Sequence, residues 1–110
     1  MTYSIFAIPS FKKDFKQLVK KYPSLKSDLE KLSKELLENP KSGTNLGQNF
    51  YKVRMAISSK GKGKSAGARV ITHLKITETT IYLTAIYDKS DKENISDKDL
   101  EYLILEIDSE

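Results

Sequence analysis

The spacing of apolar residues along the chain predicts three helices. Apolar side chains recur every three or four positions over Phe11–Tyr22 and again over Leu25–Asn39, which is the period of a helix with one buried face. Ser10 and Ser24 are the expected N-caps of these two helices, which should form an antiparallel hairpin. A third apolar stripe follows Ser96 near the end of the chain, and its acidic first turn suits a helix N-terminus.

Segments rich in β-branched and aromatic side chains predict four strands. These strands are Tyr3–Ile8, Phe50–Ile57, Arg69–Ile76 and Thr80–Tyr87. The polar segment 41–49 is predicted to be a turn-rich connector. The order β, α, α, β, β, β, α predicts one α+β domain over residues 1–110. In it, an N-terminal strand and a helix hairpin pack on a mostly antiparallel sheet, and a C-terminal helix follows.

Alternation within the two central strands predicts two different faces of the sheet. The side expected to pack against the helix hairpin carries Tyr51, Val53, Met55, Ile57, Val70, Thr72, Leu74 and Ile76. The side expected to face outward carries Phe50, Lys52, Arg54, Ala56, Arg69, Ile71, His73 and Lys75. The outward set gathers basic side chains on one surface.

The distribution of charge gives this outward surface a possible function. The net charge is +4, yet no acidic residue occurs between Glu38 and Glu78, and the chain is acidic after that. A surface of one sign attracts polyanions, so a phosphate-rich partner such as nucleic acid is expected. The loop Ser58–Gly67 contains glycines and lysines without apolar anchors, and we expect it to be mobile when unbound and to close on RNA phosphate.

Several other classes of protein are disfavoured. The chain has one histidine and no cysteine, which argues against a metal enzyme, a disulfide and a nucleophilic triad, and no cofactor is expected. The loop sequence GKGKS lacks the full spacing of a nucleotide-binding loop. No apolar run is long enough to cross a bilayer, and the N-terminus lacks the pattern of a signal peptide. These features predict a cytoplasmic protein.

Cations alone can support cleavage of RNA through its own 2′-OH. That reaction needs a base, an acid and positive charge on the five-coordinate phosphorane, which Arg and Lys supply. Crowded lysines lower one another's pKa, so one of them could act as the base. Composition alone favours the simpler alternative, in which Lys52, Arg54 and Arg69 bind phosphate without chemistry. Arg69 is the strongest single candidate, and as an outward-facing cation its loss should leave stability nearly unchanged.

Three segments carry a resemblance to a known family. The sequences GQNFYKVRM, GKGKSAGARVI and IYLTAIYDKSDKENISDKDL together resemble the RelE/ParE toxin superfamily, and its RelE/HigB branch most. The resemblance covers nearly the whole chain, including the predicted order of elements. It implies a toxin of a type II toxin–antitoxin module that enters the ribosomal A site and cuts mRNA there. A co-expressed antitoxin would inactivate it, and ribosome and mRNA would be its other partners.

The resemblance also implies roles for individual residues. Lys52, Arg54 and Arg69 match the catalytic surface, and Lys89 falls near the position of a basic transition-state stabiliser. The side chains expected to bind RNA or the ribosome are Lys60, Lys62, Lys64, His73, Lys75 and Lys92. The segment after the last strand lacks the tyrosine or histidine that some relatives use as acid or base. Two alternatives stay open. One is a gyrase-inhibiting toxin of the ParE type, and the other is an inactive member that only binds RNA or antitoxin.

Overall fold

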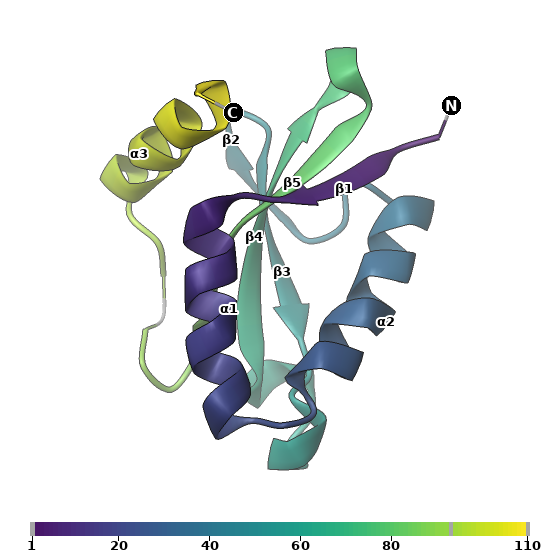
Figure 1. Ribbon diagram of the computed structural model, residues 1–110, viewed down its shortest axis with the longest axis vertical. Coiled ribbons are helices and arrows are strands. Elements are labelled where there is room, and N and C mark those ends of the chain that lie inside the picture. The colour runs from purple at the N-terminus through teal and green to yellow at the C-terminus, as the bar shows by residue number, and fades with distance from the viewer. Residues whose placement is uncertain (1, 93, 110) are drawn as a thin grey trace.

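The computed structural model describes residues 2–92 and 94–109 and contains a five-stranded sheet in the order β1-β5-β4-β3-β2 (Figure 1). The strands are β1 (Ser4–Ala7), β2 (Thr44–Gly47), β3 (Phe50–Met55), β4 (Ala68–Lys75) and β5 (Thr80–Asp88). The helices are α1 (Pro9–Lys21), α2 (Leu25–Glu38) and α3 (Asp97–Asp108). Only β1 and β5 pair in parallel, so the predicted α+β class with a mostly antiparallel sheet is confirmed.

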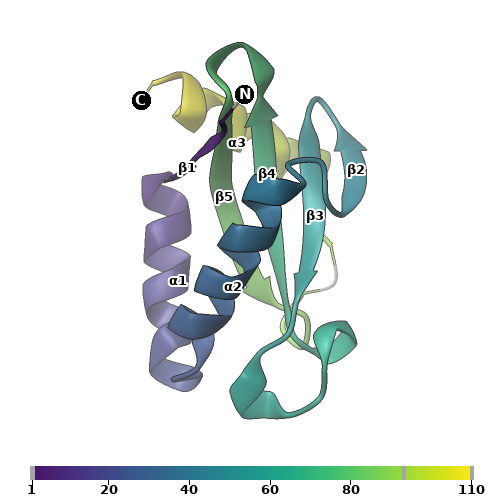
Figure 2. The same ribbon diagram turned by 90° about the vertical axis from the view of Figure 1, so that its right-hand side faces the viewer.

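The helix hairpin covers the face of the sheet that the alternation predicted. Val53 pairs with Val70 and Met55 pairs with Ala68, and all four side chains are buried. Figure 2 shows α1 and α2 on one side of the sheet and α3 on the other side, behind the strands. Ile76 is the exception to the predicted core, because it begins a short 3₁₀ turn and is 48 % exposed.

The opposite face of the sheet is only partly open to solvent. Phe50 and Ile71 point away from the helix hairpin as predicted, but both are 0 % exposed. Helix α3 lies on this side, and its buried residues are Leu100, Leu103 and Ile107. The outward face of the sheet is therefore divided: α3 covers one part, and the basic residues occupy the other.

The first turns of the helices show where local capping rules succeeded and where they failed. Ser96 is the N-cap of α3, and its hydroxyl accepts a hydrogen bond from the Asp99 amide in a capping box. Ser24 is the N-cap of α2, but its hydroxyl bonds to Asp28 and Ser59 and not to the helix backbone. Ser10 is not an N-cap at all, because α1 already begins at Pro9.

A carboxylate from α3 satisfies the start of α1. The Ser10 amide donates to Glu106 Oε2 at 2.9 Å, and the Ser10 hydroxyl donates to the other oxygen of the same carboxylate. Negative charge at this position is favourable, since the N-terminus of a helix carries partial positive charge. The same contact therefore caps α1 and fastens α3 to the rest of the fold.

The segment 41–49 contains a strand that the sequence analysis did not predict. Thr44–Gly47 pairs antiparallel with β3, and Thr44 lies opposite Lys52. Gly43 has a φ of 96°, and a Cβ at this residue would lie 2.4 Å from the Lys52 carbonyl oxygen. Only glycine permits so close an approach, which lets the chain enter β2 beside β3.

We predict that Glu106→Ala lowers the free energy of unfolding by about 1 kcal/mol, the usual cost of losing a helix cap. The variant removes both hydrogen bonds to Ser10. Chemical denaturation followed by circular dichroism measures the change. Glu101→Ala is the control, because Glu101 is an exposed residue of the same helix. Equal stability of the two variants would show that the cap contributes nothing.

Candidate active site

The basic residues of three separate segments line one pocket of about 220 Å³. Its lining consists of Thr44, Lys52, Arg54, Arg69, Lys89 and Asn94. Among the described residues that line it, none is acidic. The four side chains that the sequence analysis singled out as catalytic candidates are thus neighbours in space.

The pairing of the central strands explains this convergence. Arg54 of β3 lies directly opposite Arg69 of β4, and Arg69 in turn lies opposite Tyr87 of β5. Lys52 stands two residues before Arg54 and therefore points to the same side of the sheet. Lys89 follows the end of β5. The Nζ atom of Lys52 donates to Asn94 Oδ1 at 3.2 Å, which holds this lysine at the pocket.

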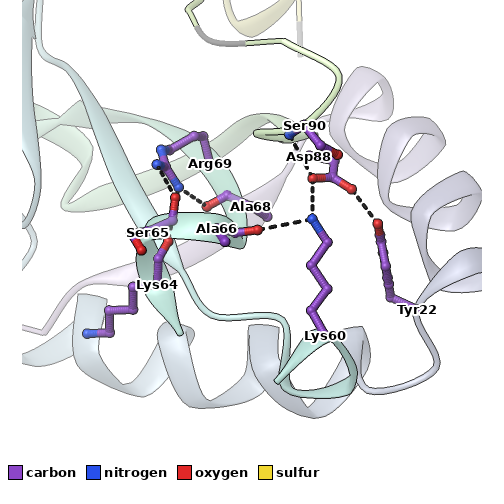
Figure 3. A network of polar contacts seen from close by, with 9 residues as sticks. All are labelled: Tyr22, Lys60, Lys64, Ser65, Ala66, Ala68, Arg69, Asp88 and Ser90. Atoms are coloured by element: carbon purple, nitrogen blue, oxygen red, sulfur yellow. Dashed lines mark hydrogen bonds and ion pairs between the residues drawn. The ribbon is translucent and has the colours of Figure 1, made fainter. Parts of the chain in front are cut away.

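Arg69 is not the exposed cation that the sequence analysis expected. Its residue is only 4 % exposed, and its guanidinium donates hydrogen bonds to backbone carbonyls (Figure 3). Nη1 reaches the oxygens of Lys64 at 3.1 Å and Ala68 at 3.2 Å, and Nη2 reaches Ser65 at 3.1 Å. These partners are neutral dipoles, so the positive charge of Arg69 is retained at the wall of the pocket. Arg69 also holds the preceding loop in place.

The loop Ser58–Gly67 is anchored by an ion pair between the partly exposed Lys60 and the buried Asp88. Lys60 Nζ lies 2.7 Å from Asp88 Oδ1 and donates to the Ala66 carbonyl at 3.0 Å (Figure 3). The Tyr22 hydroxyl donates to the second oxygen of Asp88 at 2.5 Å. Burial alone would raise the pKa of Asp88, but hydrogen bonds from Lys60, Tyr22 and Ser90 outweigh it and hold the pKa far below its ordinary value.

The beginning of the loop is fixed to α2 in a similar way. Asp28 accepts hydrogen bonds from the Ser58 amide at 2.9 Å, from the Ser58 hydroxyl and from Ser24. Burial raises the pKa of Asp28, but the bonds from Ser58 and Ser24 more than offset this, and the pKa lies below its ordinary value. The sequence analysis did not foresee that polar contacts with residues far away in the sequence hold this loop. Its mobility when unbound stays a prediction.

Comparison with known proteins gives this pocket a context. A family model described as "RelE toxin of RelE / RelB toxin-antitoxin system" matches residues 10–105. The chain belongs to the RelE toxin family. No curated protein sequence matched it. Among solved structures, a double arginine-to-alanine mutant of the E. coli toxin RelE in the free state matches with a TM-score of 0.62 and 18 % identity, covering 84 % of this chain and 90 % of that one. That likeness supports the fold.

None of the six predicted RNA-binding residues of this RelE-family toxin lines the pocket, and three of them, His73, Lys75 and Lys92, lie outside the loop beside it as well. His73 and Lys75 stand farther along β4, roughly 13 and 20 Å from Arg69 at about 3.3 Å per residue. Lys75 Nζ lies 3.9 Å from Asp108 and 3.8 Å from Glu78. Lys92 pairs with a carboxylate at 3.6 Å. Their predicted contacts with RNA stay predictions, separate from the pocket.

The single histidine is also poorly suited to proton transfer in the pocket. The ring of His73 packs edge-to-face on Phe50, with 4.6 Å between the ring centres. Burial lowers the pKa of His73 below its ordinary value, although the backbone of Gln48 opposes this. Tyr87 is buried as well, which raises its pKa, and it lines a different pocket. Neither His73 nor Tyr87 lines the pocket that contains Lys52, Arg54, Arg69 and Lys89.

The sequence analysis missed two residues of the pocket, Thr44 and Asn94. Thr44 belongs to the unpredicted strand β2, and Asn94 reaches Lys52 from the segment between β5 and α3. Asn94 lies within one of the segments that carry the family resemblance, but nothing in the sequence shows that it or Thr44 lies beside Lys52 in the fold. Within the part of the chain that the structure describes, no helix is long and apolar enough to span a membrane.

We predict that Arg69→Ala lowers the free energy of unfolding by about 2–3 kcal/mol, because the guanidinium is buried and hydrogen bonds from a charged group to carbonyls are among the stronger ones. Denaturant titration measures the loss. Arg54→Ala is the matched control, since Arg54 faces Arg69 across the strands but is exposed, and its replacement should change stability by less than about 0.5 kcal/mol. A fully stable Arg69→Ala protein would contradict the structural role.

The depressed pKa of Asp88 predicts a specific response to acid. A carboxylate whose pKa is lower in the folded state stabilises the fold above its unfolded pKa, near 4, and this contribution is lost as the pH falls towards the folded pKa. Asp88→Asn should therefore be less stable at pH 7 and should lose stability less steeply below about pH 4. Unfolding at a series of pH values tests this, with the exposed Asp91→Asn as the control. An unchanged acid slope would contradict the prediction.

Proposed function

We propose that this RelE-family toxin is an endoribonuclease that cuts mRNA on the translating ribosome and is inhibited by a cognate antitoxin. The observation that carries the proposal is the convergence of Lys52, Arg54, Arg69 and Lys89 on one pocket that has no acidic residue among its described lining. A site of this charge attracts a phosphodiester and stabilises the additional negative charge of its transition state. Membership of the family supports the same function.

The proposed reaction uses the 2′-OH of the RNA as the nucleophile. Its oxygen forms a bond to the adjacent phosphorus, a five-coordinate phosphorane develops, and the bond from phosphorus to the 5′-oxygen breaks. Arg54 and Lys89 are exposed at the pocket and contact the non-bridging oxygens, while the buried charge of Arg69 adds to the positive potential. Because neither His73 nor Tyr87 lines the pocket, the proton transfers fall to its lysines or to water.

Two alternatives make different predictions. A gyrase-inhibiting toxin needs no centre that stabilises a phosphorane, so the convergence of four cations favours the nuclease. An inactive member of the family would keep the basic surface for binding alone. Removing single cations and measuring both toxicity and cleavage separates these possibilities.

Lys52→Ala and Arg54→Ala should each lower mRNA cleavage by about a hundredfold to a thousandfold, the usual effect of removing one preorganised donor. Primer extension on mRNA from cells expressing each variant measures cleavage, and growth of the same cells measures toxicity. Lys16→Ala, on an exposed position of α1, is the control for the loss of one positive charge. Circular dichroism shows whether each variant is folded.

The outcomes identify the function. Loss of both cleavage and toxicity in the two pocket variants, with neither lost in the control, supports the nuclease. Toxicity that persists in the absence of any mRNA cleavage, for the unaltered protein as well, supports the gyrase alternative. A protein that neither cuts mRNA nor arrests growth in its unaltered form is the inactive member.

A further inference from the structure

A second pocket, of about 420 Å³, adjoins the candidate active site. Its lining consists of Tyr22, Lys60, Lys62, Ser65, Ala66, Lys89 and Ser90. Lys89 lines both pockets, so they are immediate neighbours. The volume lies within the range of roughly 300–1,000 Å³ that is usual for small-molecule sites.

The wall between the two pockets is held by hydrogen bonds. Arg69 lines the first pocket, and its Nη2 donates to the carbonyl of Ser65, which lines the second. The Lys89 amide donates to the Gly67 carbonyl at 3.1 Å, and Lys60 Nζ donates to the Ala66 carbonyl at 3.0 Å (Figure 3). The two pockets therefore have a fixed relative position before any ligand binds, which lowers the entropic cost of binding a ligand across both.

The charges in the second pocket are not all equivalent. Lys60 is neutralised by Asp88, with 2.7 Å between the charged atoms. Lys62 and Lys89 are exposed, and neither forms an ion pair with any residue that the structure describes. The positive charge that is free to meet a ligand thus comes from these two lysines.

The rest of the lining suits the sugar and base of a nucleotide. The surface of the pocket is mostly apolar, and Tyr22 and Ala66 are among its lining residues. The Lys60 Nζ atom lies 5.3 Å from the centre of the Tyr22 ring. Ser65 and Ser90 are polar residues of the same lining. Apolar surface beside a few polar groups and two free cations fits a phosphorylated, partly apolar ligand better than an isolated inorganic anion.

We propose that the second pocket holds the nucleotide next to the scissile phosphate of the same RNA strand, with Lys62 contacting the phosphate of that nucleotide and Lys89, between the pockets, contacting the scissile phosphate. The proposal rests on the proposed nuclease function, because it takes the first pocket as the place of the scissile phosphate. It assigns to Lys62 a role that the neighbouring Lys64 does not share, since Lys64 lines a third pocket, beside α2.

The test compares two short RNAs that cannot be cut, because each carries 2′-deoxyribose at every potential cleavage position. The dinucleotide contains one phosphodiester and the trinucleotide two, and either phosphodiester of the trinucleotide can occupy the first pocket, so strand direction does not matter. Backbone amide signals in NMR spectra of the full chain report on the first pocket at Thr44 and Asn94, and on the second at Ala66 and Ser90.

We expect the dinucleotide to shift the first pair of signals and the trinucleotide to shift both pairs and to bind roughly tenfold more tightly, the effect of one more charge-assisted contact. Lys62→Ala should abolish this gain while retaining the dinucleotide affinity. Lys64→Ala should weaken both ligands by the same factor and so retain the gain.

The possible failures are distinguishable. If the dinucleotide does not shift the Thr44 and Asn94 signals, and the unaltered protein cuts no mRNA, the proposed function itself fails. If the dinucleotide binds but the trinucleotide binds no more tightly, only the second site fails. Equal loss of the gain in Lys62→Ala and Lys64→Ala would show general attraction by the loop and would overturn the specific site. Lys62→Ala could instead lose ribosome binding without any loss of trinucleotide binding. That result would assign the second pocket to ribosomal RNA and would also overturn the proposed nucleotide site.

Discussion

The antiparallel pairing of β3 with β4 is the constraint on which the candidate site depends. It sets Arg54 directly opposite Arg69, although like charges facing each other across a strand pair repel. The same pairing buries Val53 against the helix layer beside Val70, and a shift of one residue would turn these side chains outward. Burial on one face thus fixes the register, and the register in turn forces the two guanidinium groups together on the other.

The lysines of the loop show how one kind of residue acquires different functions. Lys60, Lys62 and Lys64 alternate with glycine in the sequence and cannot be told apart there. In the fold, Lys60 turns inward to Asp88, which lies 28 residues away, and its charge is used to hold the loop. Lys62 and Lys64 remain exposed, but they line different pockets. Of these three lysines, Lys60 therefore holds the loop in place, whereas Lys62 and Lys64 place their charges at two separate pockets.

The sequence predicted the features that depend on local periodicity. The helices follow from the spacing of their apolar residues. The core face of the central strands follows from alternation, which correctly placed Val53 and Val70 on the buried side. Alternation gives the direction of a side chain but not what lies above it, so it could not show that Arg69 is buried beneath its own loop. The strand β2 was missed because it is short and lies at the sheet edge, with little apolar pattern.

The first strand of the sheet pairs with the last one in the sequence. Strand β1 lies at the sheet edge, parallel to β5, and Ser4 lies opposite Thr80. Contacts between residues so distant in sequence form late, because a long loop must close first. During synthesis the first strand therefore has no partner until β5 has left the ribosome. Since Ser10 is bonded to Glu106, the attachment of α1 to α3 waits even longer. A chain that ends before β5 cannot pair β1, and one that ends before Glu106 cannot attach α1 to α3.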